Sequence, residues 1–500
     1  MSQLAADDCA ARPALEEPPL VIDLDGTLLR SDMLVETFSV LLAGSPAAAL
    51  GALPSLRAGK AAFKAHVAGA VEVDVAALPW NAAVLDLIAA EQARGRRIYL
   101  ASAADRRLVE KVAEFLGPFD GIFASDADTN LSGRTKADAL CAAFGEGGFD
   151  YAGNAAVDLK VWERARHPIV VNAPARLERR VRARWPAAQV LAPREFRPAA
   201  LLRALRVHQW LKNLLLAVPL LGAHEFAPAQ LLHCLIAFFA FSLCASGVYV
   251  INDLLDLERD RRHRTKRNRP FAAGTVPVLT GLVMVPLLLL ASLALALVVG
   301  PGFLGILALY FAATLAYSLV LKRQMMLDVV VLAGLYGVRM LAGAVATGIA
   351  LSAWLGAFSL FLFTSLALIK RASELADRAA AGLGDPAGRG YRVTDLPIVE
   401  ALAAASGFTA ILVFGLYLHS DAVALLYRSP NRLWLVCVIL VYWLGRVLIL
   451  THRNEMHEDP VVFAATDRTS QALCRALAGR DPVEPVRRDP AGAARRIPVG

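Results

Sequence analysis

The sequence predicts two domains of different class: a soluble α/β domain with a helical cap, followed by an all-α domain that crosses a membrane several times. The chain has 500 residues, which is long enough for two or more domains. Residues 1 to about 200 have a soluble composition, whereas residues from about 205 to 452 are dominated by long apolar runs. With 57% hydrophobic residues overall, this uneven distribution indicates a soluble domain joined to a polytopic membrane domain.

Composition shifts along the chain set the expected boundaries. They are a polar N-terminal tail (1–18), the α/β domain (19–195, with its cap at about 34–85), the membrane domain (196–480) and a disordered basic tail (481–500). The N-terminus lacks the basic and apolar regions of a signal peptide, so we expect the α/β domain in the cytoplasm. The six cysteines are scattered without a CxxC pair, which argues against a disulfide framework and a zinc site.

Eight apolar segments are candidates for transmembrane helices. They lie near 210–223, 229–251, 277–299, 302–320, 327–348, 352–369, 398–418 and 432–451. All but the first, which Pro219 interrupts, suit a span of roughly 20 residues. A ninth segment, 461–478, contains Asp467, Arg468 and Arg475 and is a poor span by itself. The sequence therefore predicts eight or nine transmembrane helices.

The distribution of basic residues predicts the orientation of these helices. From a cytoplasmic N-terminus, the loops assigned inside are rich in Lys and Arg, whereas the turns around 224–228, 300–301 and 349–351 contain none. We therefore expect a multi-pass protein of the cytoplasmic membrane. The net charge of +8 comes from basic residues in these membrane-proximal loops, which favours phosphorylated partners over nucleic acid. The sequence leaves homo-oligomer formation open.

A cluster of oxygen-bearing side chains follows one apolar helix. Its members are Asn252, Asp253, Asp256 and Asp260. At 100° per residue they share one helix face, where carboxylate and amide oxygens suit Mg²⁺ when phosphates supply the remaining ligands. The basic run that follows could hold those phosphates, and it includes Lys266, Arg267 and Arg269. The alternative is a solvated loop of mixed charge.

Other polar residues on the cytoplasmic side are candidates for binding phosphorylated substrates. They are Lys212, Tyr317, Lys322, Lys370, Arg371, Glu374 and Arg392. With the acidic cluster they can surround one cavity, although ordinary cytoplasmic loops would show the same charge. Arg339 lies about 18 Å along its helix, where a charge is costly and usually faces a polar cavity. It is expected to bind substrate, with an inter-helix bond as the alternative.

The segment NDLLDLERD at 252–260 resembles the Asn-Asp-x-x-Asp-x-x-x-Asp motif of the UbiA superfamily of membrane prenyltransferases. The resemblance extends over about 203–450 and implies the UbiA type of helical fold. It also implies that Asn252, Asp256 and Asp260 bind Mg²⁺ and, through it, a diphosphate, with Asp253 a less certain ligand. The second aspartate motif of the superfamily is absent, and Lys370-Arg371-x-x-Glu374-x-x-Asp377 stands in its place. This departure disfavours an ordinary aromatic prenyltransferase.

Several segments resemble one branch of the superfamily, the decaprenyl-phosphate phosphoribosyltransferases. Examples are LRVHQWLKN (205–213), HRTKRNRPFAAG (263–274) and LDVVVLAGLYGVRMLAGA (327–344). The resemblance implies transfer of 5-phosphoribose from phosphoribosyl diphosphate to a polyprenyl phosphate such as decaprenyl phosphate. Two alternatives remain: a prenyltransferase that joins a polyprenyl diphosphate to an aromatic or other acceptor, and a transporter or flippase with a regulatory domain.

Two carboxylates at the end of a short apolar strand indicate phosphate chemistry in the soluble domain. Residues 20–24 form the strand, and Asp23 and Asp25 stand at its end in the segment DLDGT. Side chains two residues apart there can both reach one metal-bound phosphate. Asp23 would be the nucleophile, and Asp25 would be the general acid and base.

This segment resembles the first motif of the HAD phosphohydrolases, and other motifs of that family follow in order. The resemblance implies Mg²⁺ bound by Asp23, Asp25 and Asp158, with Ser102 and Lys136 binding the phosphate. Asn154 stands where many HAD enzymes carry Asp. We expect an active phosphatase that removes the 5-phosphate from the transferase product, with a domain that only binds phosphorylated ligands as the alternative.

Overall fold

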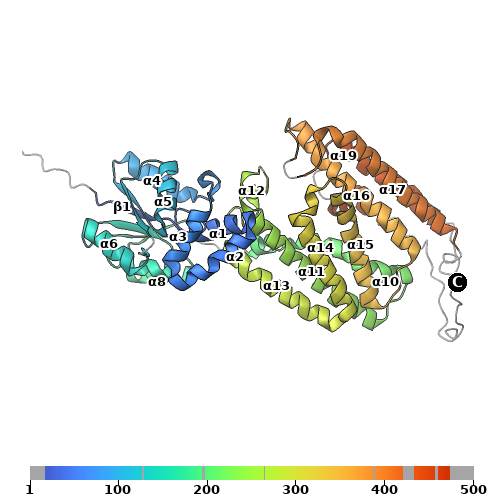
Figure 1. Cartoon of the computed structure of the whole chain (residues 1–500), viewed down its shortest axis with the longest axis horizontal. Helices are drawn as coiled ribbons and strands as arrows, with labels where there is room; N and C mark the ends of the chain where they lie inside the picture. The colour runs from blue at the N-terminus through green and yellow to red at the C-terminus, as the bar shows by residue number, and fades with distance from the viewer. Residues whose placement is uncertain are drawn as a thin grey trace, which may run out of the picture. The chain divides into compact units, whose positions relative to one another are not determined.

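The structure is a computed structural model that describes residues 17–126, 129–193, 198–263, 265–386, 389–420, 433–456 and 460–472 (Figure 1). The expected basic tail at 481–500, and most of the polar tail at 1–18, lie outside these residues. The chain divides into two compact units, the first comprising 1–205 and 250–284 and the second 206–249 and 285–500. The acidic cluster therefore belongs to the same compact unit as the α/β domain.

The first unit contains a parallel six-stranded sheet with the order β3-β2-β1-β4-β5-β6. The strands are β1 (Leu20–Asp23), β2 (Ile98–Asp105), β3 (Gly121–Ser125), β4 (Asp150–Gly153), β5 (Pro168–Val171) and β6 (Gln189–Leu191). The helices that alternate with them are α4 (Ala82–Ala93), α5 (Arg106–Leu116), α6 (Arg134–Phe144), α7 (Leu159–Trp162) and α8 (Ala175–Arg184). Because β1 lies between β2 and β4, residues at the carboxyl ends of these three strands meet at one edge.

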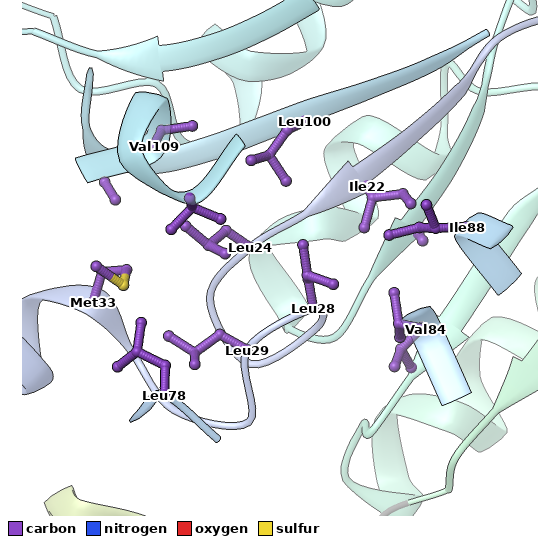
Figure 2. Packing of buried hydrophobic residues seen from close by; sticks show 14 of the residues in the cluster. Ile22, Leu24, Leu28, Leu29, Met33, Leu78, Val84, Ile88, Leu100 and Val109 are labelled. Carbon is purple, nitrogen blue, oxygen red and sulfur yellow. The ribbon is translucent and has the colours of Figure 1, made fainter. Parts of the chain in front are cut away.

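Side chains of β1 alternate between two hydrophobic cores, one on each face of the sheet. Leu20 and Ile22 pack in the first core, and Val21 packs in the second. Figure 2 shows Ile22 and Leu24 in the first core, near Leu100 of β2. This two-sided burial explains why the strand is apolar at every position before Asp23.

A helical cap interrupts the domain after β1, as predicted. It consists of α1 (Met33–Gly44), α2 (Pro46–Ala52), η1 (Leu53–Ala58), α3 (Lys60–Ala70) and η2 (Val75–Ala77). The cap has a small core of its own, in which Leu41, Phe63 and Val67 are buried. Asp32 begins α1, because its carboxylate accepts hydrogen bonds from the amides of Leu34 and Val35.

Seven helices of the described residues are long and apolar enough to cross a membrane. They are α11 (Pro228–Leu255), α13 (Val278–Val299), α14 (Pro301–Leu319), α15 (Leu327–Thr347), α16 (Ala353–Ala380), α17 (Leu396–Leu418) and α19 (Trp434–His452). The division between the two units falls within α11 and α13. Short elements connect the helices: α9 (Pro198–Ala204), η4 (Val207–Ala217), α10 (Val218–Ala223), α12 (Leu257–Arg262), η5 (Lys266–Asn268), η6 (Leu321–Arg323), η7 (Val393–Asp395) and α20 (Pro460–Thr466).

The sequence predicts eight or nine spans, and the difference from the seven helices of the described residues lies in the first and the last predicted segments. The first apolar segment forms η4 and then the short α10, with Pro219 in its first turn. Proline cannot donate the backbone hydrogen bond that would continue one helix through it, so a new helix starts there. In the last segment, α20 has seven residues, and Asp467 after it accepts hydrogen bonds from Arg446. Residues 473–478 of that segment lie outside the described part.

Helix α15 is a central element of the second unit, with buried residues around most of its surface. The backbone of η4 lies directly against it at Gly343. A Cβ at that position would stand 1.9 Å from the carbonyl oxygen of Leu216, so only glycine allows this approach.

Candidate functional site

The first candidate site lies at the carboxyl end of β1. Asp23 is 6% exposed, and Lys136 of α6 donates a hydrogen bond to its Oδ1 at 2.7 Å. The same ammonium donates to the carbonyl of Ala101 at 3.1 Å and to the hydroxyl of Tyr151 at 3.0 Å. Burial raises the pKa of Asp23 to about 6, although Lys136 opposes the shift. The strand end thus holds a buried carboxylate and its counter-charge.

Asp25 lies beside this pair. The hydroxyl of Ser102, on β2, donates to its Oδ2 at 3.3 Å, and the amide of Met33 donates to Oδ1 at 2.8 Å. Burial, with repulsion from Asp32 and Asp23, raises the pKa of Asp25 to about 7. A carboxyl group that titrates near neutral pH can act as both general acid and general base.

Lys64 is a residue near this site that the sequence does not single out. It comes from α3 of the cap, and its ammonium donates to the carbonyl of Ala103 at 2.6 Å. It also lines the same cavity as Asp23 and Asp25. In the sequence it is one lysine in an alanine-rich helix, so only the folded cap brings it to the strand ends.

Asp158 shapes the loop that follows β4. Its Oδ1 accepts from the hydroxyl of Tyr151 at 3.1 Å, and its Oδ2 accepts from the amides of Asn154 and Ala155 at 3.0 and 2.9 Å. The Asn154 side chain instead lies against Gly26, where an added Cβ would stand 1.9 Å from its amide nitrogen. Asn154 and Asp158 both line the cavity that contains Asp23 and Asp25, and the metal-binding role of Asp158 stays a prediction.

The oxygen donors at this strand edge fit a divalent cation. Asp23, Asp25, Asn154 and Asp158 line one cavity of about 890 Å³ and offer three carboxylates and one amide. Oxygen ligands of this kind suit Mg²⁺. Among the described residues, no group of three or more His, Cys, Asp or Glu side chains is already gathered closely enough to bind a metal.

Asp25→Asn should stabilise the protein at pH 8 but not at pH 4. The pKa of Asp25 rises from 3.8 to about 7 on folding, so the folded state favours the neutral carboxyl. The contribution of this group to the free energy of unfolding is therefore fully present below about pH 4 and is lost as the pH rises toward 7. An amide stays neutral throughout. We expect the unfolding temperature to rise by about 2–4 °C at pH 8 in EDTA. Thermal unfolding of both proteins at the two pH values checks this, and an equal difference at both would contradict it.

The second candidate site is the acidic cluster after α11. Helix α11 ends at Leu255 and α12 begins at Leu257. Asp256 between them has a non-helical backbone conformation, with φ −93° and ψ 11°. One guanidinium nitrogen of Arg269 donates to Asp260 at 2.6 Å and to Asp253 at 3.2 Å. Both carboxylates therefore face one side, as the spacing predicts. Burial raises the pKa of Asp260, against the opposing charge of Arg269.

The remaining residues of this cluster differ in exposure. The side chain of Asp256 is 31% exposed and lies 3.9 Å from Arg259, and Asn252 is half-buried. Lys266 and Arg267 are exposed on η5. The donors of the predicted Mg²⁺ site are thus one amide and three carboxylates, a set that fits a hard cation.

Arg371 of the second unit lies in a buried ion-pair network. Its Nη2 lies 2.7 Å from Asp328 Oδ2, and it also pairs with Glu374. The hydroxyl of Tyr391 donates to the other oxygen of Asp328 at 2.8 Å. Arg371 is 1% exposed. These contacts form a buried ion pair between α15 and α16, and the phosphate-binding role of Arg371 stays a prediction.

Arg371→Met should strongly destabilise the second unit, because it leaves Asp328 buried without its closest counter-charge. Breaking such a pair costs about 3–5 kcal/mol, whereas replacing both partners costs much less. The double variant Asp328→Leu/Arg371→Met should therefore recover most of the loss. Thermal unfolding in detergent measures both, with the exposed Arg392→Met as a control. A double variant no more stable than Arg371→Met would contradict this interpretation.

Arg339 is bound on all sides by protein groups. It donates to Asn213 Oδ1 at 2.9 Å, to the hydroxyl of Tyr310 at 3.0 Å and to the carbonyl of Leu335 at 2.5 Å. Its guanidinium also lies over the ring of Tyr336 at 5.6 Å. These contacts show inter-helix bonds of Arg339, and a role in binding substrate stays a prediction. Asn213 is the partner that the sequence does not reveal.

The other predicted substrate-binding residues of the second unit have different surroundings. Lys212 is buried, with its ammonium 5.8 Å from the centre of the Tyr336 ring. Tyr317, Lys322 and Lys370 are half-buried, and Arg392 is exposed. A cavity that joins these residues to the acidic cluster stays a prediction.

The UbiA prenyltransferase family model matches residues 214–467, about half of the chain. The chain belongs to the UbiA prenyltransferase family. The haloacid dehalogenase-like hydrolase model matches residues 20–161, which contain β1 to β4 and the cap. A UbiA-type enzyme with seven membrane-length helices is a multi-pass membrane protein, and this one carries an N-terminal HAD-like domain.

Relatives extend over different parts of this UbiA-family protein. The protein y4nM of Sinorhizobium fredii is 39% identical over 90% of this chain and 88% of its own length. Decaprenyl-phosphate phosphoribosyltransferase of Mycobacterium tuberculosis is 37% identical over 44% of this chain and 74% of its own. The solved structure of a UbiA homolog from Archaeoglobus fulgidus, bound to GPP and Mg²⁺, is 18% identical with a TM-score of 0.44. It covers 56% of this chain and 100% of the homolog.

Proposed function

We propose that this protein transfers 5-phosphoribose from phosphoribosyl diphosphate to a polyprenyl phosphate and that its HAD-like domain then removes the 5-phosphate. The observation that carries the proposal is the similarity to a decaprenyl-phosphate phosphoribosyltransferase in a chain that also contains a phosphatase-type site. Phosphoribosyl transfer would produce a phosphomonoester, and the phosphatase-type site would hydrolyse it. An aromatic prenyltransferase would give the second site no such substrate.

The transfer step is an exchange of C–O bonds at C1 of ribose. The bond from C1 to the diphosphate oxygen breaks as C1 gains oxocarbenium character, and an oxygen of the lipid phosphate forms the new bond. Asn252, Asp256 and Asp260 would hold a Mg²⁺ ion, which would supply positive charge to the departing diphosphate. Arg269 holds Asp253 and Asp260 on one side of the cluster. The lipid phosphate is already ionised at neutral pH, so proximity supplies much of the acceleration.

The hydrolysis step uses the pair at the end of β1. Asp23 attacks phosphorus to form an aspartyl phosphate, while Asp25 gives its proton to the departing sugar oxygen. Asp25 then removes a proton from the water that releases inorganic phosphate. Lys136 keeps its positive charge beside Asp23, because the carboxylates of Asp23 and Asp158 outweigh burial and raise the pKa of Lys136. Mg²⁺ at this edge would neutralise the phosphate oxygens during both steps.

Mass spectrometry of the lipids formed from polyprenyl phosphate, phosphoribosyl diphosphate and Mg²⁺ tests the proposal. We expect a polyprenyl-phosphoryl ribose, with the 5-phosphorylated form as its precursor. No pentose in the lipid, together with coupling of a polyprenyl diphosphate to an aromatic acceptor, would favour the prenyltransferase alternative. Product formation in detergent would argue against a transporter, because catalysis needs no sealed membrane.

The basic loops support an orientation with both sites on the cytoplasmic side of the inner membrane. Soluble phosphoribosyl diphosphate could then reach the acidic cluster directly. Protection of residues 20–190 from protease in sealed, right-side-out membrane vesicles, and digestion after the vesicles are opened, would support this orientation. Digestion in sealed vesicles would contradict it.

A further inference from the structure

The cavity at the HAD-like site extends far beyond the catalytic carboxylates. Its lining includes Asp23, Asp25 and Lys136, and its volume is about 890 Å³. Residues that belong to the transferase sequence also line it. They are Gly274, Thr275, Pro277, Val278 and Leu279. Since α13 begins at Val278 and is one of the seven membrane-length helices, the phosphatase cavity and a membrane span share a wall.

A buried ion pair holds the cap against this transferase segment. Arg261 of α12 donates to both carboxylate oxygens of Glu36 in α1, at 2.6 and 2.8 Å, and the two side chains are 6% and 2% exposed. Its Nε also donates to the carbonyl of Ala272 at 3.2 Å. A bidentate arginine–carboxylate pair of this kind fixes orientation as well as distance. Arg262 adds a more exposed contact with Asp74 at 2.9 Å.

The loop after α12 also approaches the loop after β1 closely. Gly274 has a φ of +67°, and a Cβ there would stand 3.0 Å from Cβ of Arg30 and 3.4 Å from Cβ of Pro79. A side chain at this position would be strained and would push the two loops apart. The wall of the cavity formed by residues 274–279 is therefore held by packing and by charge.

The lining combines polar and apolar side chains. It includes the catalytic carboxylates together with Lys64 and Arg30, and Val278 and Leu279 form an apolar wall at the start of α13. Leu279 is 62% exposed, and Leu282 and Val283 continue an exposed apolar surface along α13. A small soluble phosphate ester would leave this wall in water. A ligand with a phosphate at one end and a hydrocarbon chain at the other would cover it.

We propose that the HAD-like site acts on membrane-anchored phosphomonoesters, with the phosphosugar headgroup in the cavity and the lipid chain against the start of α13. The proposal rests on the phosphatase part of the proposed function and names its substrate class. The phosphorus–oxygen ester bond breaks as the phosphoryl group passes to Asp23, and the sugar oxygen leaves with the proton of Asp25. Water then releases inorganic phosphate, and the dephosphorylated lipid stays in the membrane.

The test uses the full chain in liposomes with Mg²⁺ and two matched probes, dodecyl riboside 5-phosphate and methyl riboside 5-phosphate. We expect kcat/KM for the dodecyl ester to exceed that for the methyl ester by at least about tenfold. Leu279→Ser should reduce this ratio toward one. Leu309→Ser removes an exposed apolar side chain from α14, away from both the cavity lining and the apolar surface of α13, and it should keep the wild-type ratio.

The wild-type ratio keeps the test decisive even if a variant fails to fold. Equal kcat/KM values for the two esters in the wild-type protein would overturn the proposal while leaving the phosphatase activity standing. An equal fall of the dodecyl-to-methyl kcat/KM ratio in both serine variants would also overturn the proposal. The preference for the dodecyl ester would then not depend on contact with Leu279. Hydrolysis of neither ester would refute the phosphatase part of the proposed function itself, and with it this inference.

Discussion

Asp23→Asn should abolish phosphate release and leave phosphoribosyl transfer intact, so that the 5-phosphorylated lipid accumulates. The amide cannot attack phosphorus, and loss of a catalytic nucleophile lowers the rate by about 10⁴-fold or more. The transfer step uses the acidic cluster after α11, which has its own carboxylates and its own counter-charge, Arg269. Lipid mass spectrometry and phosphate release, measured on the same reaction, separate the two effects.

The control for this variant is Asp138→Asn, which removes a carboxylate from the surface of α6 and breaks an exposed pair with Arg164. It should retain both activities, because exposed pairs contribute little to stability. The variant at Asp23 also loses its bond to Lys136, so its unfolding temperature should be measured in parallel. Release of phosphate from the 5-phosphorylated lipid by Asp23→Asn at the wild-type rate would refute the assignment of the nucleophile.

Local sequence patterns were enough to predict the elements that carry the sites. An apolar strand ending in two carboxylates predicted β1 with Asp23 at its end, and β1 does lie in the middle of a parallel sheet. Long apolar runs predicted the seven membrane-length helices, because a membrane span needs about 20 apolar residues in a row, which the sequence shows directly. The first run was the exception, since Pro219 divides it into η4 and α10.

Long-range partners could not be predicted from such patterns. Arg339 pairs with Asn213 and Arg261 with Glu36, although each pair is more than a hundred residues apart in the sequence. Helical periodicity states which face a residue occupies but not which element covers that face. For the same reason, the sequence did not show that residues 274–279 line the phosphatase cavity. These pairings show how each of these arginines is held in the fold.

Asp256→Asn should abolish phosphoribosyl transfer without destabilising the protein. Asp253 and Asp260 are buried and bridged by Arg269, whereas the Asp256 side chain is 31% exposed at the break between α11 and α12. A partly exposed carboxylate at a helix break can be replaced by an amide with a change in stability of about 1 kcal/mol or less. The amide carries no charge for Mg²⁺, so we expect at least a 100-fold loss of transfer, on the order seen when metal sites are impaired.

Glu258→Gln is the matched control, because Glu258 is two residues away, points to the other side and pairs with Arg262. It should retain transfer within a few-fold of wild type. Asp256→Asn should still hydrolyse the 5-phosphorylated lipid when that lipid is supplied, since the phosphatase carboxylates are untouched. Transfer by Asp256→Asn at more than a tenth of the wild-type rate would contradict the assignment of Asp256 as a metal ligand. Loss of both activities together would instead indicate that α12, through Arg261 and Glu36, holds the phosphatase cavity in its working shape.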